Sequence, residues 1–398
     1  MSEPGIGWIN SQILRWARER VRVTPEQVER EAQNLKSRFF APVTTQQVQR
    51  WEQGKEEPEL EHLETLSEIY NCPVGYFFLS EIPRESLPFS YRCLSKDESS
   101  LSESTIRGLL RFHKLARWTV YLIESLNLEW EVRIPRDQRP DSSGLQEMVA
   151  RERKRLGWSE EVRVEFKGDP GGLYRWWRRA IEGLGVFCFE QKLEPGEVRG
   201  ASFWLDDYPF ILVNRQNVEA DTGRLFTLLH EYAHLITGDK GEVCDFRGSE
   251  KGKRLEPFAN RFAALMLASP SELEKRLRSL DCFQFREVWS DAALDRIRKP
   301  FGASRDVIVI MLQQMKLAPP DLYGRKLRQW EKRKVWGRGR GGRPPLKVQK
   351  RRELGFGLSR LLSKASEHSS FLWSDVSDVL EMRVKKAEEF LKWVREEG

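Results

Sequence analysis

The sequence of 398 residues is poor in cysteine and lacks long apolar runs, and both shortages restrict what the protein can be. The five cysteines are scattered and odd in number, and no two form a C-x-x-C pair. This usage is typical of reduced thiols in a cytoplasmic protein and argues against a structural zinc site built on thiolates. No apolar run approaches the roughly 20 residues of a membrane span, and the N-terminus lacks the charged-then-apolar pattern of a signal peptide. We therefore expect a cytoplasmic protein with no membrane partner.

Histidine is also scarce, with five in the chain, yet two of them lie four residues apart in RLFTLLHEYAHLITG. These are His230 and His234, and Glu231 directly follows the first. At this histidine content, chance gives about 0.01 such patterns per chain. Side chains four apart share one face of a helix, so two imidazoles at this spacing reach a single Zn2+ at ~2.0–2.1 Å. The alternative is a pair of core histidines that hydrogen-bond to protein groups.

A catalytic zinc needs a third protein ligand and one open position. No third histidine follows within reach, so a carboxylate must complete the set. Glu256 is favoured because it lies in the opening turn of the predicted helix LEPFANRFAALMLAS, which would present it rigidly to the neighbouring helix. The other candidates belong to a Gly- and Lys-rich loop and are Asp239, Glu242, Asp245 and Glu250. A closed structural zinc site would need a fourth ligand, for which the sequence offers no obvious residue.

Glu231 is the predicted catalytic residue. One position after the first ligand, it lies beside the metal but points off its axis. There it would take a proton from the water that attacks a peptide carbonyl and hand it to the leaving amine. The sequence therefore predicts a zinc-dependent hydrolase.

The remaining pattern predicts an α+β protein with an all-α start. Residues 1–90 read as short helices: Thr24-Pro25 begins one, and Thr44 or Thr45 caps another that runs through Trp51 to Gly54. The next helix is lined by Leu60, Leu63, Leu66 and Ile69. From about residue 173, a helix, three strand-like runs (VFCFEQ, RGASFWL and PFILVN) and two further helices follow.

Positive charge is concentrated in one segment. Residues 325–352 hold thirteen Lys/Arg against the single acid Glu331, a balance of +12, so the rest of the chain carries −5 of the total of +7. Such segments often bind nucleic acid. Within it, GRGRGGRPP is incompatible with regular structure and resembles an AT-hook, whose arginines enter a narrow minor groove. The alternative is a flexible basic linker.

The central region resembles the ImmA/IrrE family of zinc metallopeptidases. RAIEGLGVFCF, PFILVN, GRLFTLLHEYAHLITG, EPFANRFAALML and FGASRDVIVIMLQQMKLA stand in that family's order, over roughly residues 170–320. The resemblance implies a zincin-like domain with His230, His234 and Glu256 as the metal ligands. The resemblance also implies a role in regulation, since such enzymes often cleave a repressor of the helix-turn-helix class.

The N-terminal region resembles the phage-repressor-like (XRE) helix-turn-helix domain that often precedes this peptidase. The resemblance rests on ILRWARER, QQVQRWEQGKEEP and LETLSEIYNCPVGYFFL. It implies that the residues facing the major groove are Thr44, Thr45, Gln46, Gln47, Gln49 and Arg50. EREAQNLKSRFFAPV departs from the pattern, because it is longer than the tight turn expected between the second and third helices. A helical module used for protein contacts is the alternative.

These resemblances divide the chain into five regions. We expect a helix-turn-helix domain (1–90), a helical connector (91–170), a metallopeptidase domain (171–322), a basic linker (323–352) and a helical C-terminal region (353–398). The leading hypothesis is a cytoplasmic, site-specific endopeptidase that acts in transcriptional regulation on a repressor or other regulatory protein. The alternative is a DNA-binding regulator, or a toxin–antitoxin component, whose metal site is vestigial or structural. DNA would then be bound by the N-terminal domain and the segment 325–352.

Overall fold

The chain forms two compact units in its computed structural model. The structure describes residues 9–35, 40–72, 74–82, 91–93, 101–136, 144–166, 168–195, 197–216, 221–238, 250–331, 344–368 and 371–397. The first unit comprises Met1–Pro88 and Asp97–Lys114, and the second comprises Phe89–Lys96 and Leu115–Gly398. The predicted fold class is confirmed, because a mixed sheet packs against helices and the N-terminal region is helical.

The first unit is a small helical bundle. Its elements are α1 (Ser11–Arg20), α2 (Pro25–Asn34), α3 (Thr45–Glu52), α4 (Leu60–Tyr70), the 3-10 helix η1 (Val74–Phe78) and the beginning of α5 (Glu103–Ser125). Thr24 and Thr44 cap α2 and α3 with reciprocal hydrogen bonds to the glutamine three residues on, as their spacing predicts. Leu60, predicted to line α4 together with Leu63, Leu66 and Ile69, is 62% exposed. As the first residue of α4, it lies beyond the buried stripe of that helix.

The second unit is organised around a four-stranded sheet in the order β1-β3-β4-β2. The strands are β1 (Tyr91–Cys93), β2 (Phe187–Gln191), β3 (Val198–Leu205) and β4 (Tyr208–Asn214). β3 and β4 form an antiparallel hairpin, and β2 runs parallel to β4. The three longer strands match the three predicted runs. β1 was not predicted; it pairs antiparallel with β3 from a segment about 100 residues away.

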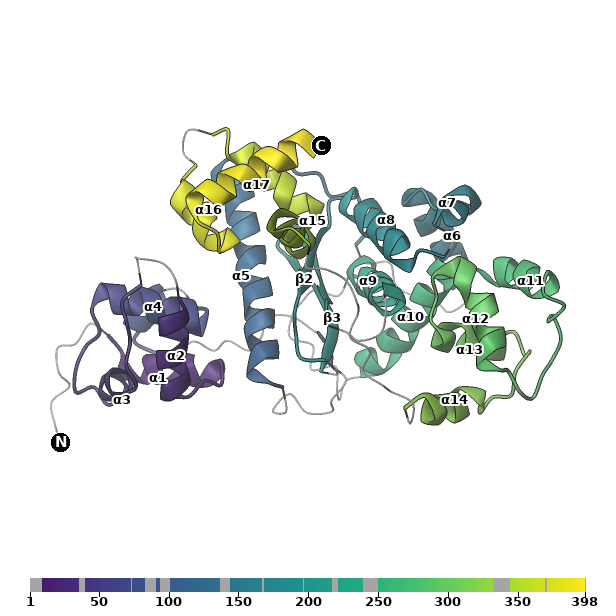
Figure 1. The fold of residues 1–398 in the computed structure, drawn as a ribbon, viewed down its shortest axis with the longest axis horizontal. Coiled ribbons are helices and arrows are strands. Elements are labelled where there is room, and N and C mark those ends of the chain that lie inside the picture. Colours follow the sequence, from purple (N-terminus) through teal and green to yellow (C-terminus); the bar gives the residue numbers. More distant parts are fainter. Residues whose placement is uncertain are drawn as a thin grey trace. The chain divides into compact units, whose positions relative to one another are not determined.

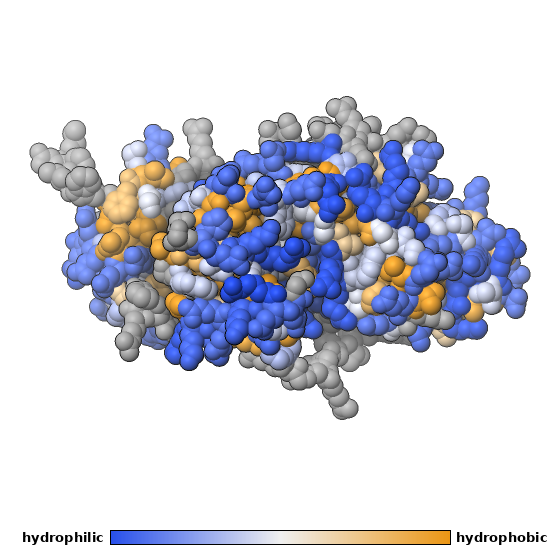
Figure 2. All heavy atoms as spheres, turned by 90° about the horizontal axis from the view of Figure 1, so that it is seen from above, coloured by the Kyte–Doolittle hydropathy of each residue, from blue (hydrophilic) through white to orange (hydrophobic). Residues whose placement is uncertain are grey.

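Some helices of the second unit pack on this sheet, and others pack on those helices (Figure 1). They are α6 (Leu145–Arg155), α7 (Glu160–Glu165), α8 (Pro170–Glu182), α9 (Asp221–Ile236), α10 (Glu250–Leu267), α11 (Pro270–Arg278), α12 (Asp291–Arg298), η3 (Lys299–Phe301), α13 (Arg305–Gln314), α14 (Leu322–Glu331), α15 (Leu346–Ala365), α16 (Trp373–Leu380) and α17 (Val384–Glu397). No helix among the described residues is both long and apolar enough to cross a membrane. On the face drawn in Figure 2, hydrophilic side chains predominate and hydrophobic ones form scattered patches.

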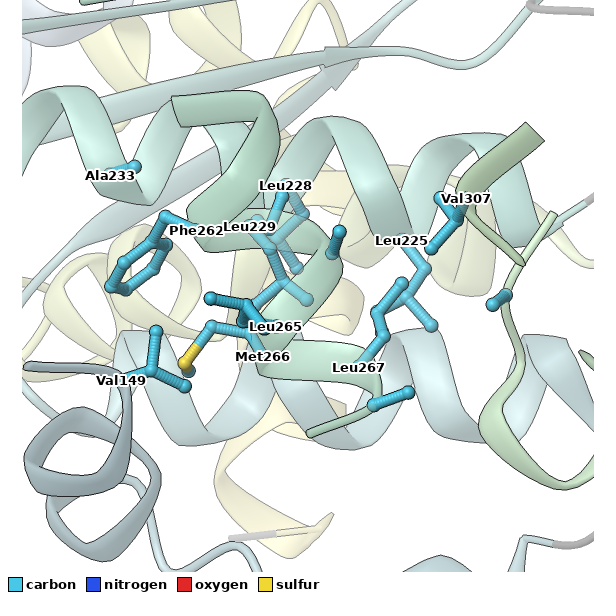
Figure 3. Packing of buried hydrophobic residues seen from close by; sticks show 14 of the residues in the cluster. Val149, Leu225, Leu228, Leu229, Ala233, Phe262, Leu265, Met266, Leu267 and Val307 are labelled. Carbon is cyan, nitrogen blue, oxygen red and sulfur yellow. The ribbon is translucent and has the colours of Figure 1, made fainter. Parts of the chain in front are cut away.

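α9 is the central helix of the core. It packs against β3 and β4, against α8 and against α10. Figure 3 shows its Leu225, Leu228 and Leu229 among the apolar side chains of α10, with Val149 of α6 close by. The three leucines are fully buried, and burial of a leucine side chain contributes about 1.5–3 kcal/mol each. α9 therefore holds a fixed position between sheet and helices.

α10 begins earlier than its sequence predicts. The helix starts at Glu250 instead of about residue 255, so Glu256 lies in its second turn and not in its opening turn. Proline lacks the N–H that an interior helix position needs, and Pro257 lies inside this helix. The backbone nevertheless continues as helix on both sides of Pro257. The helix therefore supports Glu256 from both directions.

The C-terminal helices belong to the second unit. α15 is interrupted at Gly355 (φ 77°, ψ 176°) and packs on the edge strand β2. Arg178 of α8, 6% exposed, joins the two: its Nη1 donates to the carbonyl of Arg352 at 2.7 Å and to Glu190 of β2 at 2.9 Å. A buried guanidinium needs these oxygen acceptors, so the contact holds α15 against β2.

The segment 323–352 is not a linker throughout. α14 occupies its beginning and α15 its end, while residues 332–343, with most of GRGRGGRPP, lie outside the described residues. α14 is held by Lys326, which is largely buried and donates to Asp291 of α12 at 2.7 Å. The basic composition concealed this helix, because the apolar part of Lys326 is buried while its ammonium group stays paired with Asp291.

We predict that Gly355→Ala strongly destabilises the protein. The backbone conformation at Gly355 is essentially reserved for glycine, and an added Cβ would meet Glu182 Oε1 and the carbonyl oxygen of Cys188. We expect a loss of about 2–5 kcal/mol in the free energy of unfolding, measured by denaturant titration. The control is Gly324→Ala in α14, whose Cβ would have Arg328 as its nearest neighbour at 3.8 Å. It should be neutral or stabilising by up to ~1 kcal/mol. Equal losses in both variants would contradict this account.

Candidate metal centre

α9 presents two imidazoles to the same space. His230 and His234 are one helical turn apart, and their Nε2 atoms lie 3.1 Å from each other. His230 is completely buried, while the side chain of His234 is 17% exposed. The helix is apolar on most sides, so packing around it fixes where both rings point.

Glu256 of α10 completes the group. Its Oε2 lies 3.5 Å from Nε2 of His230, and its Oε1 lies 3.4 Å from Nε2 of His234. α9 and α10 pack closely along their lengths, which brings this carboxylate to the pair of rings. Of the other predicted acids, Asp239, Glu242 and Asp245 lie outside the described residues, as does the side chain of Glu250.

The three donors fit one metal ion. Ligand atoms at ~2.0–2.1 Å from a tetrahedral ion lie about 3.4 Å apart. The two imidazole nitrogens lie 3.1 Å apart, each faces a different oxygen of Glu256 at 3.4–3.5 Å, and one ligand atom from each residue lies within 4.8 Å of the others. Among the described residues, this group contains three donors, which leaves one corner of a tetrahedron for water or substrate. The side chain of Glu256 is 47% exposed, so the group can be reached from solvent on that side.

The charge of Glu256 suits a cation. Burial raises the pKa of this carboxyl, but hydrogen bonds and charge interactions with His230 and His234 outweigh burial and hold the pKa well below its usual range. Glu256 therefore remains an anion at neutral pH. With the two imidazoles it forms the His-His-carboxylate set that is found at catalytic divalent sites.

Glu231 lies on the adjacent face of α9, turned toward the sheet. It is 2% exposed, and its Oε2 accepts a hydrogen bond of 2.7 Å from the hydroxyl of Ser202 on β3. Ser202 was not among the residues predicted for the site. Its one signal is the run of small residues GAS inside RGASFWL, where a buried strand usually has bulky side chains.

Comparison with known families bears on this site. Residues 181–313 match the family model of the IrrE N-terminal-like domain, Peptidase_M78. The chain therefore contains an IrrE N-terminal-like domain. The matched segment includes His230, Glu231, His234 and Glu256. Searches of curated proteins and of solved structures found no match to the chain.

The IrrE N-terminal-like domain covers part of the second unit. It runs from the end of α8 through the hairpin, α9 and α10 to α13. Tyr232, inside the motif, ties this domain to α6 outside it, because its buried hydroxyl donates to Glu152 at 2.7 Å. Burial raises the pKa of Tyr232 well above its ordinary value, so this hydroxyl remains a donor. The N-terminal 180 residues lie outside the family match.

The residues predicted to contact DNA lie on α3 and at its start. They are Thr44, Thr45, Gln46, Gln47, Gln49 and Arg50. Four are exposed, whereas Thr45 and Gln47 are half-buried. Thr45 donates to Glu29 of α2, and Gln47 accepts from the backbone N–H of Thr44. Arg50 pairs with Glu56 at 2.7 Å. Their role in binding DNA stays a prediction.

We predict that the purified protein binds one divalent ion and that Glu256→Ala removes most of its affinity. Loss of a direct ligand should weaken binding by more than the roughly 10–100-fold typical of outer-shell substitutions. Elemental analysis after dialysis, with chelator competition for the affinity, measures both quantities. The control is Glu274→Ala, because that exposed carboxylate pairs with Arg278 on α11. Full metal content in Glu256→Ala would mean that the histidines bind without this carboxylate.

Proposed function

We propose that the protein is a zinc-dependent endopeptidase. The observation that carries the proposal is the convergence of His230, His234 and Glu256 within hydrogen-bonding range of one another, inside an IrrE N-terminal-like domain. Imidazole and carboxylate ligands suit zinc, and three protein ligands with an open position are typical of catalytic sites. Glu231, one residue after the first ligand, supplies the base that peptide hydrolysis requires.

The chemistry of these side chains gives each of them a role in the proposed reaction. A bound Zn2+ would lower the pKa of water and polarise the peptide carbonyl. Glu231 takes the proton from the attacking water and delivers it to the amine that leaves. His230, His234 and Glu256 hold the ion, and the exposed side of Glu256 leaves an approach for an extended peptide. Burial of Glu231 keeps competing water away from the carboxylate.

We further propose that the substrate is a regulatory protein, such as a repressor, in the cytoplasm. The described cysteines are free thiols, as a reducing compartment requires. The separate N-terminal unit gives the enzyme a second module with which to select its target. Unrestricted cleavage would damage the host cell, so a broad degradative role is disfavoured.

We predict that Glu231→Gln abolishes cleavage but retains the metal. Incubation of the zinc-loaded protein with a repressor encoded beside its gene, followed by mass spectrometry of the products, should reveal a single cut. Loss of a general base lowers the rate by about 10²–10⁴-fold, while the ligands are unchanged. Glu274→Gln is the matched control. Cleavage by Glu231→Gln at the parent's rate would contradict the mechanism.

A second candidate function is DNA binding, alone or within a toxin–antitoxin system. It is favoured by the exposed Gln46, Gln49 and Arg50 on α3, since glutamine and arginine are good readers of base edges. The basic segment 325–352 would add phosphate contacts. Against it, residues 1–90 hold ten Lys/Arg and fourteen Asp/Glu, a balance of −4. Arg50 would also have to leave its partner Glu56. We therefore rank this function below the peptidase.

If DNA is a partner, we predict that affinity falls steeply with salt. Each phosphate contact contributes about −0.9 to the slope of log K against log salt. Fluorescence anisotropy with a duplex of roughly 20 base pairs, long enough for two half-sites, measures this slope. Replacing the six Lys/Arg of residues 332–343 with serine should flatten it, and Arg50→Ala should cost about 1–3 kcal/mol. Affinity that ignores salt and survives both changes would rule the function out.

A further inference from the structure

β3 and α9 pack together with matching spacing, so that every second residue of β3 meets every fourth residue of α9. Alternate residues of β3 face the helix: Gly200 lies against Thr227 and Glu231, Ser202 bonds to Glu231, and Trp204 donates to the carbonyl of Leu235 at 3.0 Å. Two residues of a strand span about 6.7 Å, and four residues of a helix span about 6 Å. The two rows therefore stay in step, which places Ser202 opposite Glu231.

Ser202 restrains a carboxylate that burial has removed from water. Glu231 is 2% exposed and Ser202 is 9% exposed, so bulk water has little access to either. A buried charged group needs hydrogen bonds in place of its lost hydration. The hydroxyl of Ser202 supplies one at 2.7 Å. A glutamate side chain has several rotamers, and this bond selects the one directed at β3.

Gly200 forms the opposite boundary of the same space. A Cβ at this position would lie 2.9 Å from Oε1 of Glu231, 3.0 Å from its Cγ and 2.6 Å from Cγ2 of Thr227. These are closer than ordinary van der Waals contacts. The carboxylate of Glu231 thus occupies the space that any side chain at residue 200 would need.

We propose that Ser202 is a positioning residue for Glu231, and that Gly200 provides the space in which Ser202 holds it. This inference rests on the proposed function, since it concerns the base of that reaction. The hydroxyl bonds to one carboxylate oxygen, Oε2, and the other, Oε1, lies beside Gly200, so the carboxylate has one defined orientation. Without the hydroxyl, Glu231 keeps its place on α9 but loses its fixed direction. Ser202 bonds to Glu231 and not to the metal ligands, so Ser202→Ala leaves His230, His234 and Glu256 in place.

The test uses the full-length protein loaded with Co2+, whose visible absorption reports its ligands, and acetohydroxamate as the probe. Acetohydroxamate loses its hydroxyl proton when it chelates a metal, and a correctly placed carboxylate accepts that proton. Its affinity therefore reports the position of Glu231 without a protein substrate. The variants are Ser202→Ala, Ser202→Thr, Gly200→Ala and Glu231→Gln, with the double variant of Ser202→Ala and Glu231→Gln.

We expect Ser202→Ala to bind Co2+ as the parent does but to bind acetohydroxamate at least tenfold more weakly, as loss of a hydrogen bond to a charged group implies. Ser202→Thr keeps the hydroxyl and should restore affinity to within about threefold. Gly200→Ala should likewise weaken the binding of acetohydroxamate. In the Glu231→Gln background, Ser202→Ala should add nothing, because the two residues act as a unit. With a cleaved substrate, the same variants should lower kcat and leave KM nearly unchanged.

Ser359→Ala is the matched control for lost packing. Ser359 is completely buried in α15, and its hydroxyl donates to the carbonyl of Gly355 at 2.5 Å. It should destabilise the fold without changing the affinity for acetohydroxamate. Parent-like affinity in Ser202→Ala, or an equal loss in Ser359→Ala, would overturn the positioning role and leave the metal site standing. A parent protein that takes up no Co2+ would overturn the proposed function and this inference together.

Discussion

The candidate site depends on the packing of one helix, α9, between a sheet and a second helix. Its faces have different neighbours: His230 and His234 point to α10, Glu231 to β3, and Tyr232 to α6. Each contact is short-ranged, so none would hold if the helix moved along its axis or rotated. The buried leucines of α9 prevent such movement. A catalytic group has to be held to within a fraction of an ångström, and here the hydrophobic core provides that precision.

The features that could be predicted from the sequence are those with a regular spacing within a single helix or strand. The spacing of His230 and His234 is a property of a helix, and the three strand-like runs are a property of alternation, so both were visible in the residues themselves. Glu256 could be named because its helix pattern was apolar on one face. The beginning of α10 was misplaced, because its first five residues, EKGKR, contain no apolar side chain and so show no helical pattern of their own.

Contacts between distant segments could not be predicted in the same way. Ser202 and Glu231 are 29 residues apart, and their meeting depends on the register between a strand and a helix, which no local pattern encodes. β1 contributes three residues to the sheet and is too short to show periodicity. α14 was hidden by its charge, because the sequence does not reveal that Lys326 finds Asp291. The gaps in prediction are thus the long-range pairings, not the chemistry of the residues.

The docking of α15 on β2 affects how the catalytic region can be isolated. The family match ends at residue 313. However, β2 is an edge strand of the sheet, and α15, which lies after the match, covers it. A fragment cut at that border would lose the carbonyl of Arg352, which accepts from the buried guanidinium of Arg178. It would also uncover strand backbone of the kind that promotes aggregation between copies. The autonomous folding unit is therefore longer than the homologous segment, and expression boundaries drawn from homology alone would produce an insoluble fragment.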